Sequence, residues 1–444
     1  MRDIIFGGLW AIMYPLSFYS AHLGILLWIW VALIGPNELM YGILGSVPFN
    51  KLVAFSALMV LMFNRRLRKD FYFDGLMGIV AAYAFIVTLS YLFAHYSSSF
   101  SDFLYDKFWK ELLLAVLITG IMFTRARLHQ TTLVVGLAFG FYMVKEGLIF
   151  LLTAGGHKIT GIASTGDNNG FACAILMAIP LVLYCANYTE DRWVRLVMQI
   201  TAGLGAVTVM ATYSRGGFVG LVVLGIMLLR GSRYKIRTII AVALCAVALY
   251  YISPADYTSR IDTITSATQD NSFMTRVVAW KINLLMAMDH PFLGAGLYAC
   301  TLWSNWSVYA DAASTFLFPT PPVYKTFVAH SIYFQVLGDT GFTGFILFLI
   351  MFATALYKTM RTRKLARQDP SLVWAADLAR ATQTSIVVYL VAGAALSLVY
   401  FELIYIILAV VSRNHRTVVE ALAARVPARA RRPAGLAPAY RPAM

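Results

Sequence analysis

The sequence carries little charge for its length. Of its 444 residues, 13% are charged and 60% are hydrophobic, whereas soluble globular proteins carry about 25% charged residues. The apolar residues also fall in long blocks. This composition excludes a soluble enzyme, a disordered chain and a nucleic-acid-binding module. It predicts an all-α polytopic membrane protein.

Several motifs that support common chemistries are missing as well. The four cysteines lie mostly in apolar runs without CxxC spacing, so they predict neither a disulfide framework nor a metal site. The sequence has no Walker loop, zinc motif or paired-carboxylate DxD motif. We therefore expect no ATP chemistry, no metal-bound nucleotide-sugar and no cofactor.

What the sequence does contain is a series of apolar segments with lengths close to the 20 or so residues of a membrane span. Several are short, which favours tilted or broken helices. Residues 1–63 add two further spans in our preferred interpretation, or three, and two of them bring the total to about twelve. The other ten predicted spans are 73–94, 107–123, 131–153, 170–186, 194–212, 216–230, 238–252, 331–358, 376–397 and 401–412.

Positive charge is distributed unequally between the two sets of connections. Alternate connections hold most of the 36 Lys and Arg residues, and this parity holds across all ten spans. Because Lys and Arg concentrate in cytoplasmic loops, this set faces the cytoplasm. The net charge of +15 is therefore a topology signal and predicts no nucleic-acid partner. The basic connections are 64–70, 124–130, 187–195, 230–237, 358–380 and the tail from Arg413.

The spans divide the chain into four parts. Membrane helices at 1–252 precede a segment at about 253–329 on the outer face, which is too long for a simple connector. Within it, residues 274–288 predict an amphipathic helix on or near the membrane, and the rest predicts irregular, lid-like structure. Further membrane helices follow at 330–412, and residues 413–444 form a basic cytoplasmic tail.

Four polar clusters lie on the predicted outer face, and this shared side is the strongest indication of a site. The first cluster, Gly166-Asp167-Asn168-Asn169, comes directly before a span. Asp and Asn at such a place cap the helix. Alternatively, Asn donors beside a helix N-terminus bind an anion.

The second cluster, Tyr213-Ser214-Arg215-Gly216-Gly217, stands between two spans with almost no loop. An arginine this close to hydrocarbon either reaches the interface or meets an anion. The two glycines would let a phosphate approach the backbone. We therefore expect this cluster to contact a phosphate group.

The third and fourth clusters belong to the outer segment and the span after it. Arg276 and Lys281 lie on the predicted amphipathic helix, where such charges contact either a substrate phosphate or only solvent and lipid head groups. His330 opens the run at 330–335, which ends at Gln335. It is either a structural residue or a base, since imidazole titrates near neutral pH.

Lys145 and Glu146 form a fifth feature, inside the span 131–153. Adjacent charges at membrane depth indicate a functional site by default, or else they pair with other buried groups. The cations of the outer-face clusters together suit a diphosphate, because the planar arginine side chain matches phosphate geometry. A diphosphate donor on this face would have to be lipid-linked, since no nucleotide is supplied there.

The polar motifs, taken in their order along the chain, resemble the O-antigen ligase and polymerase superfamily. The resemblance covers residues 130–412 and is closest to O-antigen ligase (WaaL) and the related O-glycosylation ligases, while residues 1–130 resemble the family only in hydropathy. The motifs that carry it are Gly155-Gly156, Gly166-Asp167-Asn168-Asn169, Ser214-Arg215-Gly216-Gly217, Arg276 with Trp280, His290-Pro291-Phe292-Leu293-Gly294-Ala295-Gly296, and His330-Ser331 through Gly338-Asp339-Thr340-Gly341.

This resemblance implies a GT-C-like membrane glycosyltransferase, inverting and metal-independent, in the bacterial inner membrane. Such a ligase moves O-antigen polysaccharide from undecaprenyl diphosphate to lipid A–core at the periplasmic face, so both are implied partners beside membrane lipids. The family's essential arginines correspond to Arg215 and Arg276, and its essential histidine to His330. The residues expected to bind substrate are Lys145, Asp167, Asn168, Asn169, Tyr213, Ser214, Lys281 and Gln335.

Two alternatives remain open at this stage. An O-antigen polymerase or a protein O-oligosaccharyltransferase is similar in its motifs and uses the same donor. A lipid-linked glycan transporter should show internal repeats and charges near the bilayer midplane. No repeat is evident and the charges gather at one face, which favours an enzyme, although Lys145 and Glu146 favour the transporter.

Overall fold

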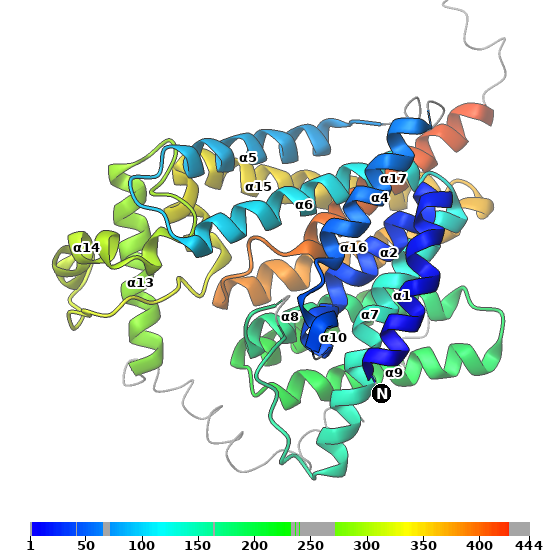
Figure 1. The fold of residues 1–444 in the computed structure, drawn as a ribbon, viewed down its shortest axis with the longest axis horizontal. Coiled ribbons are helices and arrows are strands. Elements are labelled where there is room, and N and C mark those ends of the chain that lie inside the picture. The colour runs from blue at the N-terminus through cyan, green and yellow to red at the C-terminus, as the bar shows by residue number, and fades with distance from the viewer. Residues whose placement is uncertain are drawn as a thin grey trace, which may run out of the picture.

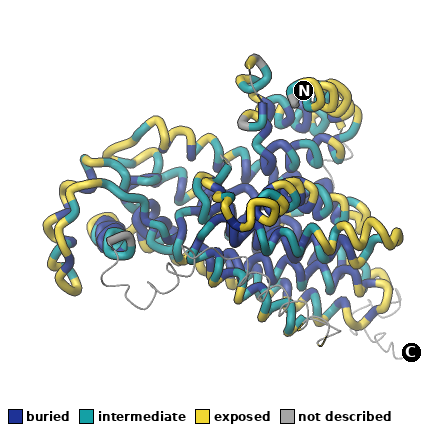
Figure 2. Tube along the Cα trace, turned by 90° about the horizontal axis from the view of Figure 1, so that it is seen from below, coloured by how far each residue is buried: buried dark blue, intermediate teal, exposed yellow. Residues whose placement is uncertain are grey.

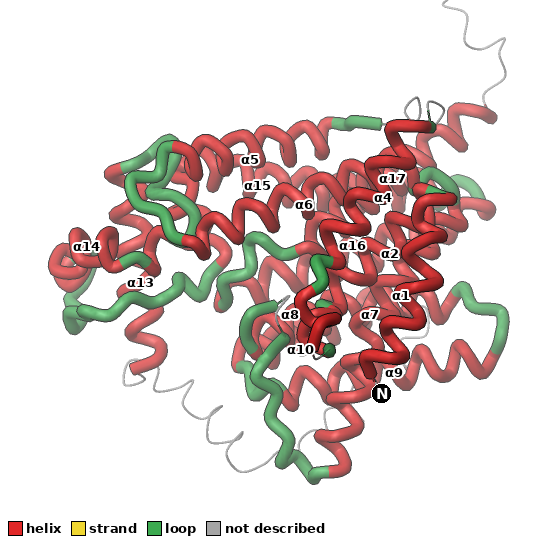
Figure 3. Tube along the Cα trace, viewed as in Figure 1, coloured by secondary structure: helices red, strands yellow, loops and turns green. Residues whose placement is uncertain are grey.

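The computed structural model describes residues 2–40, 42–64, 72–162, 165–231, 236, 239 and 271–425. Throughout this part of the chain every regular element is a helix, and Figure 3 shows no strand. Six segments within it are long and apolar enough to cross a membrane. The prediction of an all-α polytopic membrane protein is thus confirmed. The predicted span 238–252 lies outside the described residues, apart from the single residue 239.

Three longer helices occupy the N-terminal 63 residues. They are α1 (Arg2–Tyr19), α2 (Ala21–Ile34) and α4 (Phe49–Phe63), with the single turn α3 (Pro36–Leu39) after α2. Gly35, at a φ of 60°, ends α2 in the left-handed conformation that glycine adopts readily. The chain also breaks at Ser20, between α1 and α2. Of these helices, α2 and α4 are short apolar ones, and our preferred interpretation of two spans stays a prediction.

The central bundle follows the predicted spans closely. Most of its helices begin at an Asp, Ser or Thr that caps the first turn, as at Asp74, Ser98 and Thr124. Helix α8 is buried along nearly its whole length and lies at the centre of the bundle. The bundle helices are α5 (Gly75–Leu92), α6 (Ser99–Ile121), α7 (Arg125–Leu152), α8 (Asn168–Asn187), α9 (Arg192–Ala211) and α10 (Arg215–Gly231).

The C-terminal helices complete the bundle and differ from the prediction at their ends. These are α15 (Ile332–Ala366), α16 (Val373–Ala392) and α17 (Glu402–Arg425). α15 is interrupted at Gly341, where φ is 67°. α17 runs beyond the predicted end at residue 412, because Arg413 is buried and pairs with Glu420. The first part of the predicted tail is therefore helical, and residues 426–444 lie outside the described part.

The outer segment forms a small packed lobe at one end of the bundle (Figure 1). It contains α13 (Asn271–Asp289) and α14 (Trp303–Thr315), and α13 packs against both α14 and α15. The predicted helix at 274–288 is confirmed as α13, and α14 is a helix that the sequence did not predict within a segment that is otherwise largely irregular. Buried apolar residues of α13 enter a separate hydrophobic core with Trp306 and Ala310. That the helix lies on or near the membrane stays a prediction. Figure 2 shows the buried interior of the bundle and the more exposed margin.

Candidate active site

The helices α8 and α10 begin with side-chain caps, at the end of the bundle that the charge pattern predicts to face outward. Asp167 caps α8, because its Oδ1 accepts a hydrogen bond from the backbone N of Gly170 at 2.7 Å. Ser214 caps α10, because its hydroxyl accepts from the backbone N of Gly217 at 2.9 Å. Each cap satisfies one of the free amides at a helix start. The N-cap interpretation of Asp167 is confirmed.

The same two helix starts are joined to each other. The hydroxyl of Ser214 donates to Oδ1 of Asn169 at 2.7 Å. The Nδ2 of Asn168 donates to the carbonyl of Thr212 at 2.8 Å. These bonds hold the first turn of α8 against the start of α10. Arg215, the first residue of α10, is half-buried there.

The outer lobe brings its arginine toward the histidine. Trp280 on α13 donates from Nε1 to the carbonyl of Ala329 at 2.7 Å, and its ring stacks on Phe334 of α15 with centroids 5.2 Å apart. These contacts fix α13 beside the residue that directly precedes His330. Arg276 lies one helical turn before Trp280, and its charge acts on His330.

His330 is held in an unusual backbone conformation and a partly buried environment. Its φ is 45°, in the left-handed region, and its backbone N donates to Oγ of Ser397 at 2.8 Å. Burial lowers the pKa of the imidazole below its ordinary value and the charge of Arg276 lowers the pKa further, while Asp167 acts in the opposite direction. The imidazole is therefore neutral at pH 7 and able to accept a proton.

The short loop between α16 and α17 connects the remaining parts of the site. A Cβ on Gly216 would lie 3.5 Å from that of Ala395, so α10 begins against this loop. A Cβ on Gly393 would lie only 2.6 Å from Cδ1 of Ile332, so α15 begins against it as well. Through these contacts the N-termini of α8, α10 and α15 converge.

This convergence creates a place suited to an anion. Each helix N-terminus carries a partial positive charge of about +0.5. Ser331 at the start of α15 makes no side-chain cap bond, so first-turn amides of α15 have no side-chain acceptor at the cap. Arg215 begins α10, and the charge of Arg276 acts on His330 beside the start of α15. Positive groups therefore gather at these helix ends, where anions bind favourably.

Backbone strain concentrates around the same place. Among the described residues, the non-glycine residues with positive φ include Tyr213, Tyr298 and His330. Tyr213 directly precedes the Ser-Arg-Gly-Gly motif, and the hydroxyl of Tyr298 donates to the carbonyl of Ser397 at 3.3 Å. Such conformations cost about 1–3 kcal/mol each and cluster at functional sites.

Lys281 has a structural environment that the sequence did not predict. Its ammonium group is buried in the outer lobe and donates to the carbonyls of Ala313 and Phe318 and to the hydroxyl of Thr320. It also lies 4.0 Å from the centre of the Phe318 ring. These contacts close the loop after α14, and they commit the ammonium group to the protein itself instead of to a substrate.

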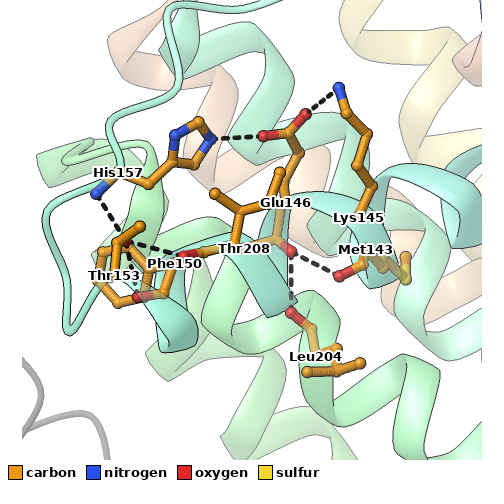
Figure 4. Close-up of polar contacts among 9 residues, drawn as sticks. Met143, Lys145, Glu146, Phe150, Thr153, His157, Leu204 and Thr208 are labelled. Atoms are coloured by element: carbon orange, nitrogen blue, oxygen red, sulfur yellow. Dashed lines mark hydrogen bonds and ion pairs between the residues drawn. The ribbon is translucent and has the colours of Figure 1, made fainter.

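Lys145 is exposed, whereas Gln335 is buried. The ammonium group of Lys145 pairs with Glu146 at 2.8 Å, and Glu146 also contacts His157 (Figure 4). The side chain of Gln335 is buried in the first turn of α15. The alternative that Lys145 and Glu146 pair with other groups is the one that the structure supports.

Sequence reasoning did not find three residues that build the site. They are Ser397, Tyr298 and the buried Asp339, whose carboxylate accepts from the backbone N of Tyr298 at 2.9 Å and from the hydroxyl of Tyr400 at 3.0 Å. Asp339 lies in the Gly338–Gly341 motif, which was a usable signal. Ser397 had none, because it is a single hydroxyl in an apolar stretch.

The arrangement gathers an imidazole whose pKa is lowered, two arginines and helix N-termini in one part of the molecule. These are group types that accept a proton and bind an anion. No group of three or more His, Cys, Asp or Glu side chains in the described ranges is placed to hold a metal ion.

Comparison with known proteins gives two family matches. Residues 200–349 match the O-antigen ligase family, and this stretch includes Arg215, Arg276 and His330. Residues 1–190, which include Lys145 and Asp167, match a family of unknown function. None of the curated proteins compared with the chain matches it. The match over residues 200–349 supports membership of the O-antigen ligase/polymerase superfamily.

Proposed function

We propose that the protein is an O-antigen ligase of the bacterial inner membrane. It transfers O-antigen polysaccharide from undecaprenyl diphosphate to lipid A–core at the periplasmic face, in lipopolysaccharide biosynthesis. The coarser part of this proposal, a multi-pass membrane protein of glycosyltransferase type, follows from the family match and the apolar helices. The identity of the donor, the identity of the acceptor and the roles of the residues are part of what we propose.

The observation that carries the proposal is the meeting of three helix N-termini, two arginines and a neutral histidine. A site with this many positive groups suits a diphosphate, whose charge grows as it leaves. Arg276 acts on His330 through its charge, so the base and the diphosphate contacts belong to one site. Few membrane functions other than transfer from a lipid diphosphate need both.

His330 acts as the general base in this mechanism. It takes the proton from the acceptor hydroxyl as the new C–O bond forms at the anomeric carbon. The bond from that carbon to the diphosphate oxygen breaks on the opposite face, so the configuration inverts. Arg215 and Arg276 bind the diphosphate and stabilise its developing charge. The electron pair of the broken bond leaves with the diphosphate.

Energy and metal requirements follow from this chemistry. Cleavage of the sugar–phosphate bond supplies the driving force, so we propose that neither ATP nor a divalent cation is required. Incubation with EDTA tests this part directly. An activity that EDTA removes and magnesium restores would contradict the proposed role of the arginines as the sole charge-stabilising groups.

The test of the proposed function is transfer by the purified full-length protein in vesicles. The donor is undecaprenyl-diphosphate-linked glycan, offered with lipid A–core, peptide or glycan acceptors in separate reactions. We expect glycan on lipid A–core, and no product with His330→Ala. Product only on glycan would identify a polymerase, and product only on peptide a protein O-oligosaccharyltransferase. Donor movement across the membrane without any product would identify a transporter.

A further inference from the structure

A compact ionic cluster lies in the C-terminal part of α7 and the loop that follows it (Figure 4). Glu146 is the central residue, with a side chain that is only 11% exposed. One carboxylate oxygen lies 2.8 Å from Nζ of Lys145, and the other lies 2.6 Å from Nε2 of His157. Since a carboxylate only accepts hydrogen bonds, His157 donates through Nε2.

His157 belongs to the loop that follows α7, so the cluster fastens this loop to the helix. The backbone N of His157 donates to the hydroxyl of Thr153 at 3.0 Å. Between them the chain reverses direction through Ala154 and Gly155, with φ values of 47° and 86°. The result is a tight turn that is held at its far end by Glu146.

The fastened loop supports Tyr213 in its strained conformation. The hydroxyl of Tyr213 donates to the carbonyl of Gly155 at 2.7 Å. Its ring also packs edge-on against Phe150, with centroids 6.5 Å apart. Further along the loop, the backbone N of Ile159 donates to the carbonyl of Ala211 at 3.0 Å. Loop 153–162 therefore holds the chain directly before Arg215 from two points.

The other end of the same loop contacts the start of α8. Gly161 has a φ of 119°, and a Cβ at this position would lie 2.6 Å from the carbonyl carbon of Asp167. The loop thus runs from Tyr213 to Asp167 across one side of the site. A displacement of the loop would act on both.

The helix that carries Glu146 is itself rigidly placed. A Cβ on Gly147 would lie 2.8 Å from the carbonyl oxygen of Leu204, so α7 and α9 are in close backbone contact. The hydroxyl of Thr208 donates to the carbonyl of Met143 at 3.0 Å, as Figure 4 also shows. The ionic cluster is therefore a fixed point for the loop.

We propose that Glu146 and His157 are positioning residues that anchor loop 153–162, hold Tyr213 in its strained conformation and thereby place Arg215 on the diphosphate. This inference rests on the proposed function for its catalytic consequence, though not for the anchor itself. A misplacement of about 1 Å at a reacting group costs up to about 100-fold in rate. We expect loss of the anchor to lower kcat about 10- to 100-fold.

The test uses the full-length protein in vesicles with undecaprenyl-diphosphate-linked glycan and its acceptor. His157→Ala removes the anchor but leaves the Lys145–Glu146 pair, so folding is preserved. His157→Gln restores much of the activity, because the amide can donate to Glu146 in the same way. Asp106→Asn is the matched control, since it breaks a different ion pair in the outer part of α6, with Lys110, and leaves transfer unchanged.

A double-mutant cycle separates positioning from general stability. Tyr213→Phe removes the hydroxyl bond to Gly155. If His157 acts through Tyr213, the double variant is no slower than the slower single variant, because both changes break the same link. Multiplied losses in kcat, or a kcat of His157→Ala equal to wild type, would overturn the proposal.

Amide hydrogen exchange provides a readout that does not depend on transfer. We expect the peptide covering loop 153–162 to exchange faster in His157→Ala and at the wild-type rate in His157→Gln. Unchanged exchange in His157→Ala would refute the anchor. Absence of transfer by the wild-type protein together with the expected exchange would refute the proposed function alone.

Discussion

Replacement of Ser397 by alanine tests how His330 is held. The Ser397 hydroxyl accepts from the backbone N of His330 at 2.8 Å, and it is the contact that fixes a histidine at a φ of 45°. Ser397→Ala removes this acceptor without adding volume. The imidazole itself, its burial and the charge of Arg276 are left in place, so the change acts on the position of the base alone.

The size of the effect follows from two opposing contributions. A left-handed backbone costs a non-glycine residue about 1–2 kcal/mol. A hydrogen bond contributes about 0.5–1.5 kcal/mol net to stability, and an unpaired buried amide costs about 1–3 kcal/mol. The bond and the strain are thus of similar size, and losing the bond lets His330 relax. Since 1.4 kcal/mol corresponds to a factor of ten, we expect kcat to fall about tenfold.

The assay is the initial rate of glycan transfer in vesicles, with donor binding measured in parallel. Ser397→Thr keeps the hydroxyl and should retain activity. Ser385→Ala is the matched control, since it removes a buried hydrogen bond of 2.7 Å from Ser385 in α16 to the carbonyl of Met177 in α8. The reasoning is refuted by a wild-type kcat in Ser397→Ala, or by equal losses in Ser397→Ala and Ser385→Ala.

Three further predictions concern the charged groups of the site. Arg215→Ala or Arg276→Ala should lower the transfer rate about 10²- to 10³-fold in folded protein, and lysine should rescue poorly because the bidentate fork is lost; a rate near wild type in either would contradict the assignment. His330→Ala should abolish transfer while equilibrium binding of undecaprenyl diphosphate persists, whereas loss of binding would make His330 a phosphate ligand. Burial and the charge of Arg276 hold the pKa of His330 below its ordinary value, while Asp167 raises it. The transfer rate should therefore fall on the acid side only below about pH 6.5. Asp167→Asn should move this acid limb to lower pH, and a shift to higher pH would contradict the effect assigned to Asp167.

Much of the fold follows from local sequence. The predicted spans agree with the bundle helices because apolar runs of this length must bury their backbone polar groups inside helices. The starts of these helices are also predictable from the sequence, because Asp, Ser and Thr are the preferred capping residues. The caps are Asp74, Ser98, Thr124 and Asp167. In the outer lobe the helix at 274–288 was predictable, but its packing against α14 was not, because tertiary packing decides the partner of an amphipathic helix.

The site was only partly accessible to the same reasoning. Polar residues beside apolar spans indicated Arg215, Asp167 and His330, since such residues are costly without a purpose. The hydrogen-bond partners of Lys281 could not be predicted, because they are carbonyls of a loop more than 30 residues away in the chain. Ser397 became visible only when the path of the loop between α16 and α17 was known. Contacts between segments far apart in the chain leave no local pattern.

The meeting of the helix starts has a consequence for the stability of the protein without its substrate. Like-signed helix ends and guanidinium groups that share one site would repel one another, and Asp167 at the start of α8 supplies a negative charge there. A bound diphosphate lipid would act as their counter-ion, and binding to the folded state alone raises its stability by an amount that grows with ligand concentration. The donor would then be a structural component of the folded protein, and purification into detergent without anionic lipid would lower its melting temperature.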